Sequence, residues 1–100
     1  MNTATIGVWQ KNPALAWREI DDETVIISPG DSVMHELNDT ASFIWKNVDG
    51  KRNCAQIAEL LVAEYDVTPE LALEDTQALL EQLVTRNLLV PNVALAGRVA

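Results

Sequence analysis

The sequence predicts an α+β fold of the winged-helix type, in which a three-stranded antiparallel sheet is followed by three helices. Apolar residues recur with a period close to two up to Leu37 and close to four from there to about Arg86, which indicates strands and then helices. A length of 100 residues, 48% of them hydrophobic, accommodates one domain with its own core. We assign residues 14–90 to this domain, 1–13 to an N-terminal arm expected to be mobile, and 91–100 to a C-terminal tail.

Three strands are expected in the first part of the domain. Residues 16–20 and 24–28 are two short runs separated by three acidic residues, and the second run is rich in β-branched side chains, which predicts a hairpin. Residues 28–31 read Ser-Pro-Gly-Asp, a turn signal because proline presets one backbone dihedral and glycine accepts a positive one. A third strand over residues 33–37 leaves one edge of the small sheet open. We expect Val33, His35 and Leu37 on one of its faces and Met34 and Glu36 on the other.

The first helix follows this strand directly. Asn38 or Asp39 can cap it, and Asp49-Gly50 ends it, because glycine accepts the left-handed conformation that closes many helices. A second helix starts after Asn53. The predicted buried positions of these two helices are Ala41, Ile44, Trp45, Val48, Cys54, Ile57, Ala58, Leu61 and Tyr65.

Thr68-Pro69 predicts the start of a third helix, since threonine caps free amides and proline at the first position has no amide to lose. This helix runs to about Arg86, and residues 88–90 add a short terminal extension before Pro91 stops it.

The charge distribution argues against nucleic acid and membrane partners. The formal net charge is −8, and no lysine or arginine lies between Arg52 and Arg86, where seven acidic residues fall. DNA-binding surfaces gain affinity by neutralising phosphates with basic side chains, and only Lys46, Lys51 and Arg52 cluster here. Apolar stretches are far shorter than a membrane helix, and no secretion signal opens the chain, so we expect a cytoplasmic location.

Catalytic and metal-binding chemistry have little support in the sequence. There is one cysteine, Cys54, on the apolar stripe of the second helix, where a buried and inert thiol is expected. His35 is the only histidine, so neither a nucleophile with its base nor a transition-metal ligand set can be assembled. The glycines are scattered singly, which excludes a phosphate-binding loop. We therefore expect no enzyme activity, no cofactor and no metal.

Residues 35–45 read His-Glu-Leu-Asn-Asp-Thr-Ala-Ser-Phe-Ile-Trp and resemble the PqqD family. That family has a Leu-Asn-x-Thr-Ala-x-x-Ile-Trp segment, then Asp-Gly, then an Ile-Ala-x-x-Leu helix, then an aspartate and leucines in a final helix. The resemblance covers about residues 16–90. The matching residues are Leu37, Asn38, Thr40, Ala41, Ile44, Trp45, Asp49, Gly50, Ile57, Ala58, Leu61, Tyr65, Val67, Asp75, Leu79, Leu80 and Leu83.

The resemblance implies a non-catalytic adaptor. Members of the family bind the leader of a ribosomally made precursor peptide and present it to a modifying enzyme, commonly a radical S-adenosylmethionine enzyme, in pyrroloquinoline quinone synthesis or another peptide-modification pathway. The leader adds as a strand beside the third strand, in a groove closed by the third helix. Carried onto this chain, the peptide-binding residues are Val33, Met34, His35, Glu36, Leu37, Thr76, Leu79, Leu80 and Leu83. Leu37 and Leu83 are better explained as core residues.

Two other functions remain open. A winged-helix DNA-binding regulator shares the architecture but needs a basic recognition helix. A regulatory or assembly subunit would bind only an enzyme surface. A homodimer is also compatible with the sequence, because an open strand edge or an exchanged hairpin can pair two copies.

Overall fold

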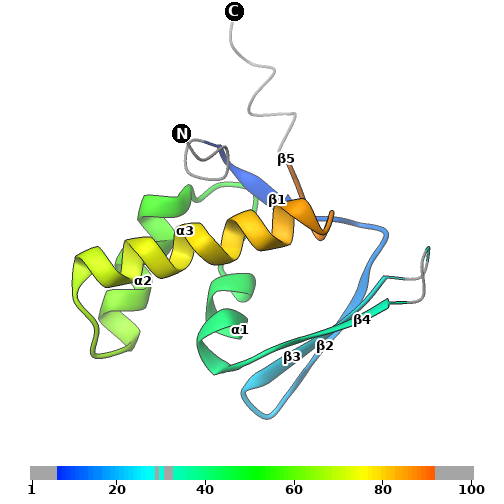
Figure 1. Ribbon diagram of the computed structural model, residues 1–100, viewed down its shortest axis with the longest axis horizontal. Coiled ribbons are helices and arrows are strands. Elements are labelled where there is room, and N and C mark those ends of the chain that lie inside the picture. The colour runs from blue at the N-terminus through cyan, green and yellow to red at the C-terminus, as the bar shows by residue number, and fades with distance from the viewer. Residues whose placement is uncertain (1–6, 29, 31–32, 92–100) are drawn as a thin grey trace, which may run out of the picture.

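The computed structural model describes residues 7–28, 30 and 33–91 (Figure 1). The predicted α+β fold is confirmed, with a three-stranded antiparallel sheet followed by three helices. A second, two-stranded sheet joins the two ends of the described chain. The elements are β1 (Trp9–Lys11), β2 (Ala16–Ile20), β3 (Glu23–Ser28), β4 (Val33–Leu37), α1 (Asp39–Lys46), α2 (Cys54–Glu64), α3 (Pro69–Thr85) and β5 (Leu89–Pro91).

The three-stranded sheet has the order β2-β3-β4. Ile20 pairs with Glu23 across a two-residue turn, in which Asp21 takes a φ of 56°. β2 and β4 have the predicted bounds, whereas β3 starts one residue earlier because Glu23 extends the ladder. Three of the residues around the predicted Ser-Pro-Gly-Asp turn, Pro29, Asp31 and Ser32, lie outside the described residues.

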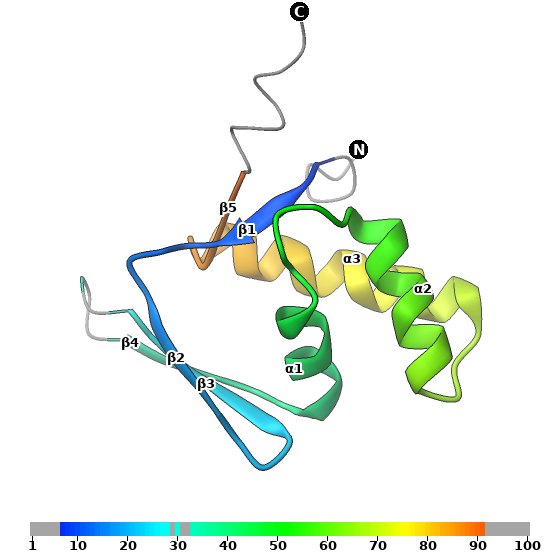
Figure 2. The same cartoon turned by 180° about the vertical axis from the view of Figure 1, so that it is seen from behind.

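One face of this sheet packs on α1, and the other lies on the outside of the molecule (Figure 2). Thr24, Ile26 and Leu37 point inward and are buried. Trp17 belongs to the same face, and its ring meets that of Trp45 edge to face at a centroid distance of 5.8 Å. The alternation predicted for β4 therefore holds, with Leu37 on the core side.

All three helices begin at capping residues that the sequence indicates. The side chain of Asn38 accepts a hydrogen bond from the Ala41 amide at the start of α1. Asn53 and Gln56 form a reciprocal capping box at the start of α2. Thr68 caps α3, with Pro69 at its first position. These side chains satisfy amides that have no partner within the helix.

α1 ends earlier than predicted. Its last residue is Lys46 and Asn47 caps it, while Val48 is buried beyond the helix. Gly50 has the expected positive φ, 81°, but uses it in the connection to α2, where its amide donates a hydrogen bond to the Trp9 carbonyl at 3.0 Å. The glycine thus shapes the connection rather than the helix end.

Asn87, not Pro91, ends α3. Asn87 adopts a φ of 62°, its amide donates to the Val84 carbonyl, and the Leu88 amide donates to the Leu83 carbonyl. This is the hydrogen-bond pattern of a Schellman cap. Residues 88–90 therefore do not extend the helix: the chain turns away from it and enters β5.

The N-terminal arm, predicted to be mobile, contains β1, which pairs antiparallel with β5 and places Trp9 opposite Pro91. Trp9 is buried, which fixes this segment to the core. The Lys11 ammonium donates to the Val48 carbonyl at 2.7 Å and lies 5.4 Å from the ring centroids of Trp17 and Trp45. Partial burial lowers the pKa of Lys11.

The core lies where the inner sheet face, the three helices and β5 meet. Its buried apolar residues are Trp9, Ile26, Leu37, Ile44, Trp45, Val48, Cys54, Ile57, Ala58, Leu61, Ala72, Leu80, Leu83, Leu88 and Leu89.

Candidate functional site

The outer edge of β4 is open. In the described part of the chain, β4 pairs with β3 on one side and no strand pairs with its other side. In an antiparallel ladder the backbone groups of alternate residues point toward the partner strand and away from it. Every second residue of β4 therefore presents its amide and carbonyl at the open edge, which is a template for an added strand.

A groove begins where β4 ends. β4 leads directly into α1, and in both views α1 lies between the three-stranded sheet and α3 (Figures 1 and 2). The groove between α1 and α3 has a volume of about 370 Å³. Its lining residues are Asn38, Thr40, Ala41 and Ile44 from α1 and its cap, and Asp75, Ala78, Leu79 and Gln82 from α3.

The groove has an apolar floor and an acidic rim. Ile44 is buried and Leu79 half-buried, so they form the floor, whereas Asp75 and Gln82 are exposed. The lining includes one carboxylate, that of Asp75, and no basic side chain. The side-chain oxygen of Asn38 accepts the Ala41 amide, which fixes this side chain at the junction of β4 and α1. The arrangement fits an extended chain with apolar side chains and a basic one better than an anion.

The structure brings only some of the predicted peptide-binding residues to this site. Within β4, Val33, Met34 and Glu36 are exposed, His35 is half-buried and Leu37 is buried.

On α3, Thr76, Leu80 and Leu83 are buried in the core and do not reach the groove, whereas Leu79 lines it. Three further α3 residues in the groove, Asp75, Ala78 and Gln82, were missed. Together with Leu79 they follow the spacing i, i+3, i+4 and i+7, which defines one face of a helix. Because that face is of mixed polarity, a search for apolar stripes alone passes over it.

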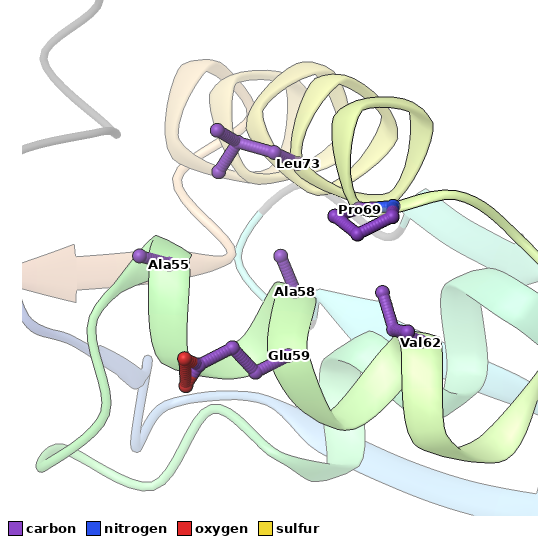
Figure 3. A pocket seen from close by; sticks show the side chains of 6 residues that line it. All are labelled: Ala55, Ala58, Glu59, Val62, Pro69 and Leu73. Atoms are coloured by element: carbon purple, nitrogen blue, oxygen red, sulfur yellow. The ribbon is translucent and has the colours of Figure 1, made fainter.

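A second concavity lies between α2 and α3 (Figure 3). It has a volume of about 210 Å³, and its side chains are mostly small or apolar, with Glu59 the one charged group. No strand edge or set of converging polar groups accompanies it among its lining residues, which are Ala55, Ala58, Glu59, Val62, Pro69 and Leu73.

The described residues hold no candidate metal centre. No group of three or more histidine, cysteine, aspartate or glutamate residues within them is arranged to hold a metal ion. Cys54 is buried, and burial raises the pKa of its thiol, which keeps the sulfur protonated. Buried polar atoms without a hydrogen-bond partner occur at Thr24 Oγ1, Trp45 Nε1 and Thr76 Oγ1, each within the core.

The basic cluster is largely neutralised by neighbouring carboxylates. Lys46 Nζ contacts Glu19 Oε2 at 2.7 Å, and Arg52 Nη1 contacts Asp49 Oδ2 at 2.9 Å. Two of the three basic groups that could meet a phosphate are thus already paired. Each helix that the structure describes falls short of the length and apolar character needed to cross a membrane.

The chain is similar to a known family and to solved structures. The family model described as coenzyme PQQ synthesis protein D (PqqD) matches residues 23–89. The structure of lasso peptide synthetase B1 complexed with its leader peptide has a TM-score of 0.76 and 25% identity, covering 85% of this chain and 100% of that one. TbiB1 in complex with the TbiA(beta) leader peptide has a TM-score of 0.74 and 25% identity, covering 80% and 93%.

A third structure is the PqqD truncation of PqqCD from Methylobacterium extorquens, described as a functional, stand-alone recognition element for ribosomally synthesised and post-translationally modified peptides. It has a TM-score of 0.69 and 25% identity, covering 87% of this chain and 97% of that one. A comparison with curated protein sequences gives no significant match.

Proposed function

The chain belongs to the PqqD family, and on that premise we propose that it is a non-catalytic adaptor for a ribosomally synthesised precursor peptide. It binds the leader by strand addition to β4 and presents the rest of the precursor to a modifying enzyme. The observation that carries this proposal is the open edge of β4, which runs into the groove between α1 and α3. The similar structures that hold leader peptides support the same class of ligand.

The two parts of the site contribute differently. Backbone amides and carbonyls at the open edge of β4 (Val33–Leu37) can hydrogen-bond to an extended peptide of almost any sequence, so these bonds supply affinity. Selectivity comes from the groove, where Leu79 and Ile44 favour an apolar side chain and Asp75 favours lysine or arginine. Of the nine peptide-binding residues proposed from the family, the five on β4 and Leu79 form this site, and the other three support it from the core.

The adaptor acts by raising the local concentration of the precursor at the enzyme, which family membership suggests is a radical S-adenosylmethionine enzyme. A leader affinity near 1 μM, about 8 kcal/mol, is sufficient for this role. The residues of this chain supply no step of the chemistry itself.

The test is an NMR titration of the protein with synthetic leader peptides of ribosomally synthesised precursors. Strand addition predicts shifts along β4 and the groove face of α3. It also predicts slowed hydrogen exchange at alternate amides of Val33–Leu37, since only these point to the open edge. Protection of no β4 amide at saturating peptide contradicts strand addition.

A DNA duplex in a parallel titration distinguishes the adaptor from a regulator. α3 contains four acidic and no basic residues, so we expect no shifts with DNA. Salt-sensitive shifts around Lys46, Lys51 and Arg52 on adding DNA, without a response to the leader, would instead support the winged-helix regulator.

A further inference from the structure

The outer face of the three-stranded sheet exposes apolar side chains that no described residue covers. Ile20 is 53% exposed, Ile27 46% and Met34 60%. These three belong to the face opposite the one that packs on α1, as do Val25 and Ala16. Ala16, Ile20, Val25 and Ile27 also line a shallow concavity of about 390 Å³ on the hairpin. We call the outer side chains of β2, β3 and β4 the outer sheet face.

Residues that face one another across β2, β3 and β4 form rows on the outer sheet face, and in one of these rows two opposite charges flank an apolar residue. Arg18 pairs with Val25 on β3, and Val25 pairs with Glu36 on β4, so the row reads positive, apolar, negative across the three strands. The next row is wholly apolar and runs from Ala16 through Ile27 to Met34. Arg18 and Glu36 are exposed, and neither takes part in the ion pairs of the described residues.

These two rows are self-complementary, whereas the exposed Glu23 at the start of β3 faces its own equivalent in the second copy. A twofold axis parallel to β3 between two such faces places β2 of each copy over β4 of the other. Arg18 of one copy then lies over Glu36 of the second copy, and the symmetry repeats this pair. Ile27 meets its own equivalent, and Ala16 offers a small partner for the long Met34 side chain. Aligned packing of two sheets with their inner faces interdigitated is a common arrangement of this kind.

We propose that the outer sheet face is a homodimer interface, in which two copies pack sheet to sheet with reciprocal Arg18–Glu36 pairs. Three strands about 4.8 Å apart and five residues long give a face of roughly 15 Å by 17 Å, which buries clearly less than the roughly 1,200 Å² of a stable interface, so the dimer is weak and transient. The groove lies on the opposite side of the sheet, and the β4 edge is not covered by face-to-face packing. Both sites therefore stay open in the dimer.

The test is sedimentation velocity on the full chain at concentrations from about 10 μM to about 1 mM, which spans transient association. The wild type is expected to shift from monomer toward dimer. Arg18→Glu or Glu36→Arg alone is expected to weaken association about tenfold, because each change places like charges at two symmetric positions. The double variant Arg18→Glu with Glu36→Arg restores it, since both pairs reform with reversed polarity.

Arg86→Glu is the matched control, because it reverses an exposed charge at the C-cap of α3, away from the sheet, and is expected to leave association unchanged. A second readout is the methyl NMR signals of Ile27 and Met34, which are expected to shift with protein concentration while those of Leu71, exposed on α3, do not. A wild type that stays monomeric throughout overturns the proposal. A dimer that both single variants leave intact also overturns it, because the contact would then lie at a strand edge. A double variant that fails to restore association overturns it as well.

Discussion

The Tyr65 hydroxyl donates a hydrogen bond to Asp39 Oδ1 at 2.7 Å, linking the C-cap of α2 to the first residue of α1. The same ring meets Phe43 edge to face at a centroid distance of 5.5 Å. The hydrogen bond to the Asp39 carboxylate, with a smaller contribution from burial, raises the pKa of Tyr65 to about 12.

Alkaline pH is expected to weaken this contact. In the unfolded chain Tyr65 loses its proton near its ordinary pKa of 10, whereas the folded protein retains it to about 12. The contribution to the free energy of unfolding is therefore complete below pH 10 and is lost as the pH rises toward 12. Tyr65→Phe is expected to cost about 0.5–1 kcal/mol at neutral pH and to remove this part of the decline, as measured by urea unfolding across the range.

Tyr65 is the only tyrosine in the chain, so the ultraviolet absorbance of the phenolate reports its ionisation directly. Asp39→Asn is the matched control, because it keeps the side-chain shape and removes the charge. We expect the titration to move back toward 10 in this variant. An unshifted titration in the wild type would show that the hydrogen bond does not persist in solution.

Trp9 is expected to contribute strongly to stability although it lies near the N-terminus. Trp9 is 6% exposed. Its backbone takes part in the pairing of β1 with β5, and its carbonyl accepts a hydrogen bond from the Gly50 amide. Trp9→Ala should lower the free energy of unfolding by about 3 kcal/mol or more, the usual cost of removing a buried aromatic ring. Trp17→Ala is the comparison, because Trp17 is 42% exposed and should cost clearly less. Equal, small losses would mean that the arm does not pack as described.

The contrast between β4 and β1 shows what local sequence can predict. The bounds of β4 follow from the alternation of its side chains, and the starts of α2 and α3 follow from their capping residues, Asn53 and Thr68. The pairing of β1 with β5 joins three residues to three others at the far end of the domain, so no periodicity develops in either segment. In these two segments, the large apolar side chain of Trp9 is the only sequence feature that indicates packing against the domain.

The candidate site was predictable to a similar extent. The open edge of β4 follows from the order of the strands, which the hairpin signal supplies. The face of α3 that meets the groove depends on how the helix rotates against α1, and apolar residues such as Leu80 and Leu83 mark the side turned to the core. The groove side of α3 carries Asp75 before Leu79 in the sequence and Gln82 after it. This polar and apolar pattern identifies the groove face only once the position of α1 is known.

Asn87 is expected to be replaceable by glycine but not by a β-branched residue. It ends α3 with a φ of 62°, which costs most L-residues roughly 1–2 kcal/mol. Asn87→Gly should stay within about 0.5 kcal/mol of the wild type, and Asn87→Val should lose about 1–2 kcal/mol in urea unfolding. Thr85→Val, two residues earlier and exposed within the helix, controls for the new side chain and should change little. Equal effects of the Gly and Val changes would contradict the left-handed cap.

Ala78→Trp tests the groove by filling it. Ala78 is exposed on α3 and lines the groove, so an indole there should occupy the space of the leader side chain and lower leader affinity at least about tenfold, as measured by calorimetry. Ala63→Trp is the matched control, because Ala63 is exposed on α2 outside that groove and the same change there should leave affinity intact. Both variants should melt near the wild-type temperature, since neither position is in the core. If Ala78→Trp binds the leader as tightly as Ala63→Trp, the peptide follows the β4 edge without entering the groove, and selectivity must arise from the strand itself.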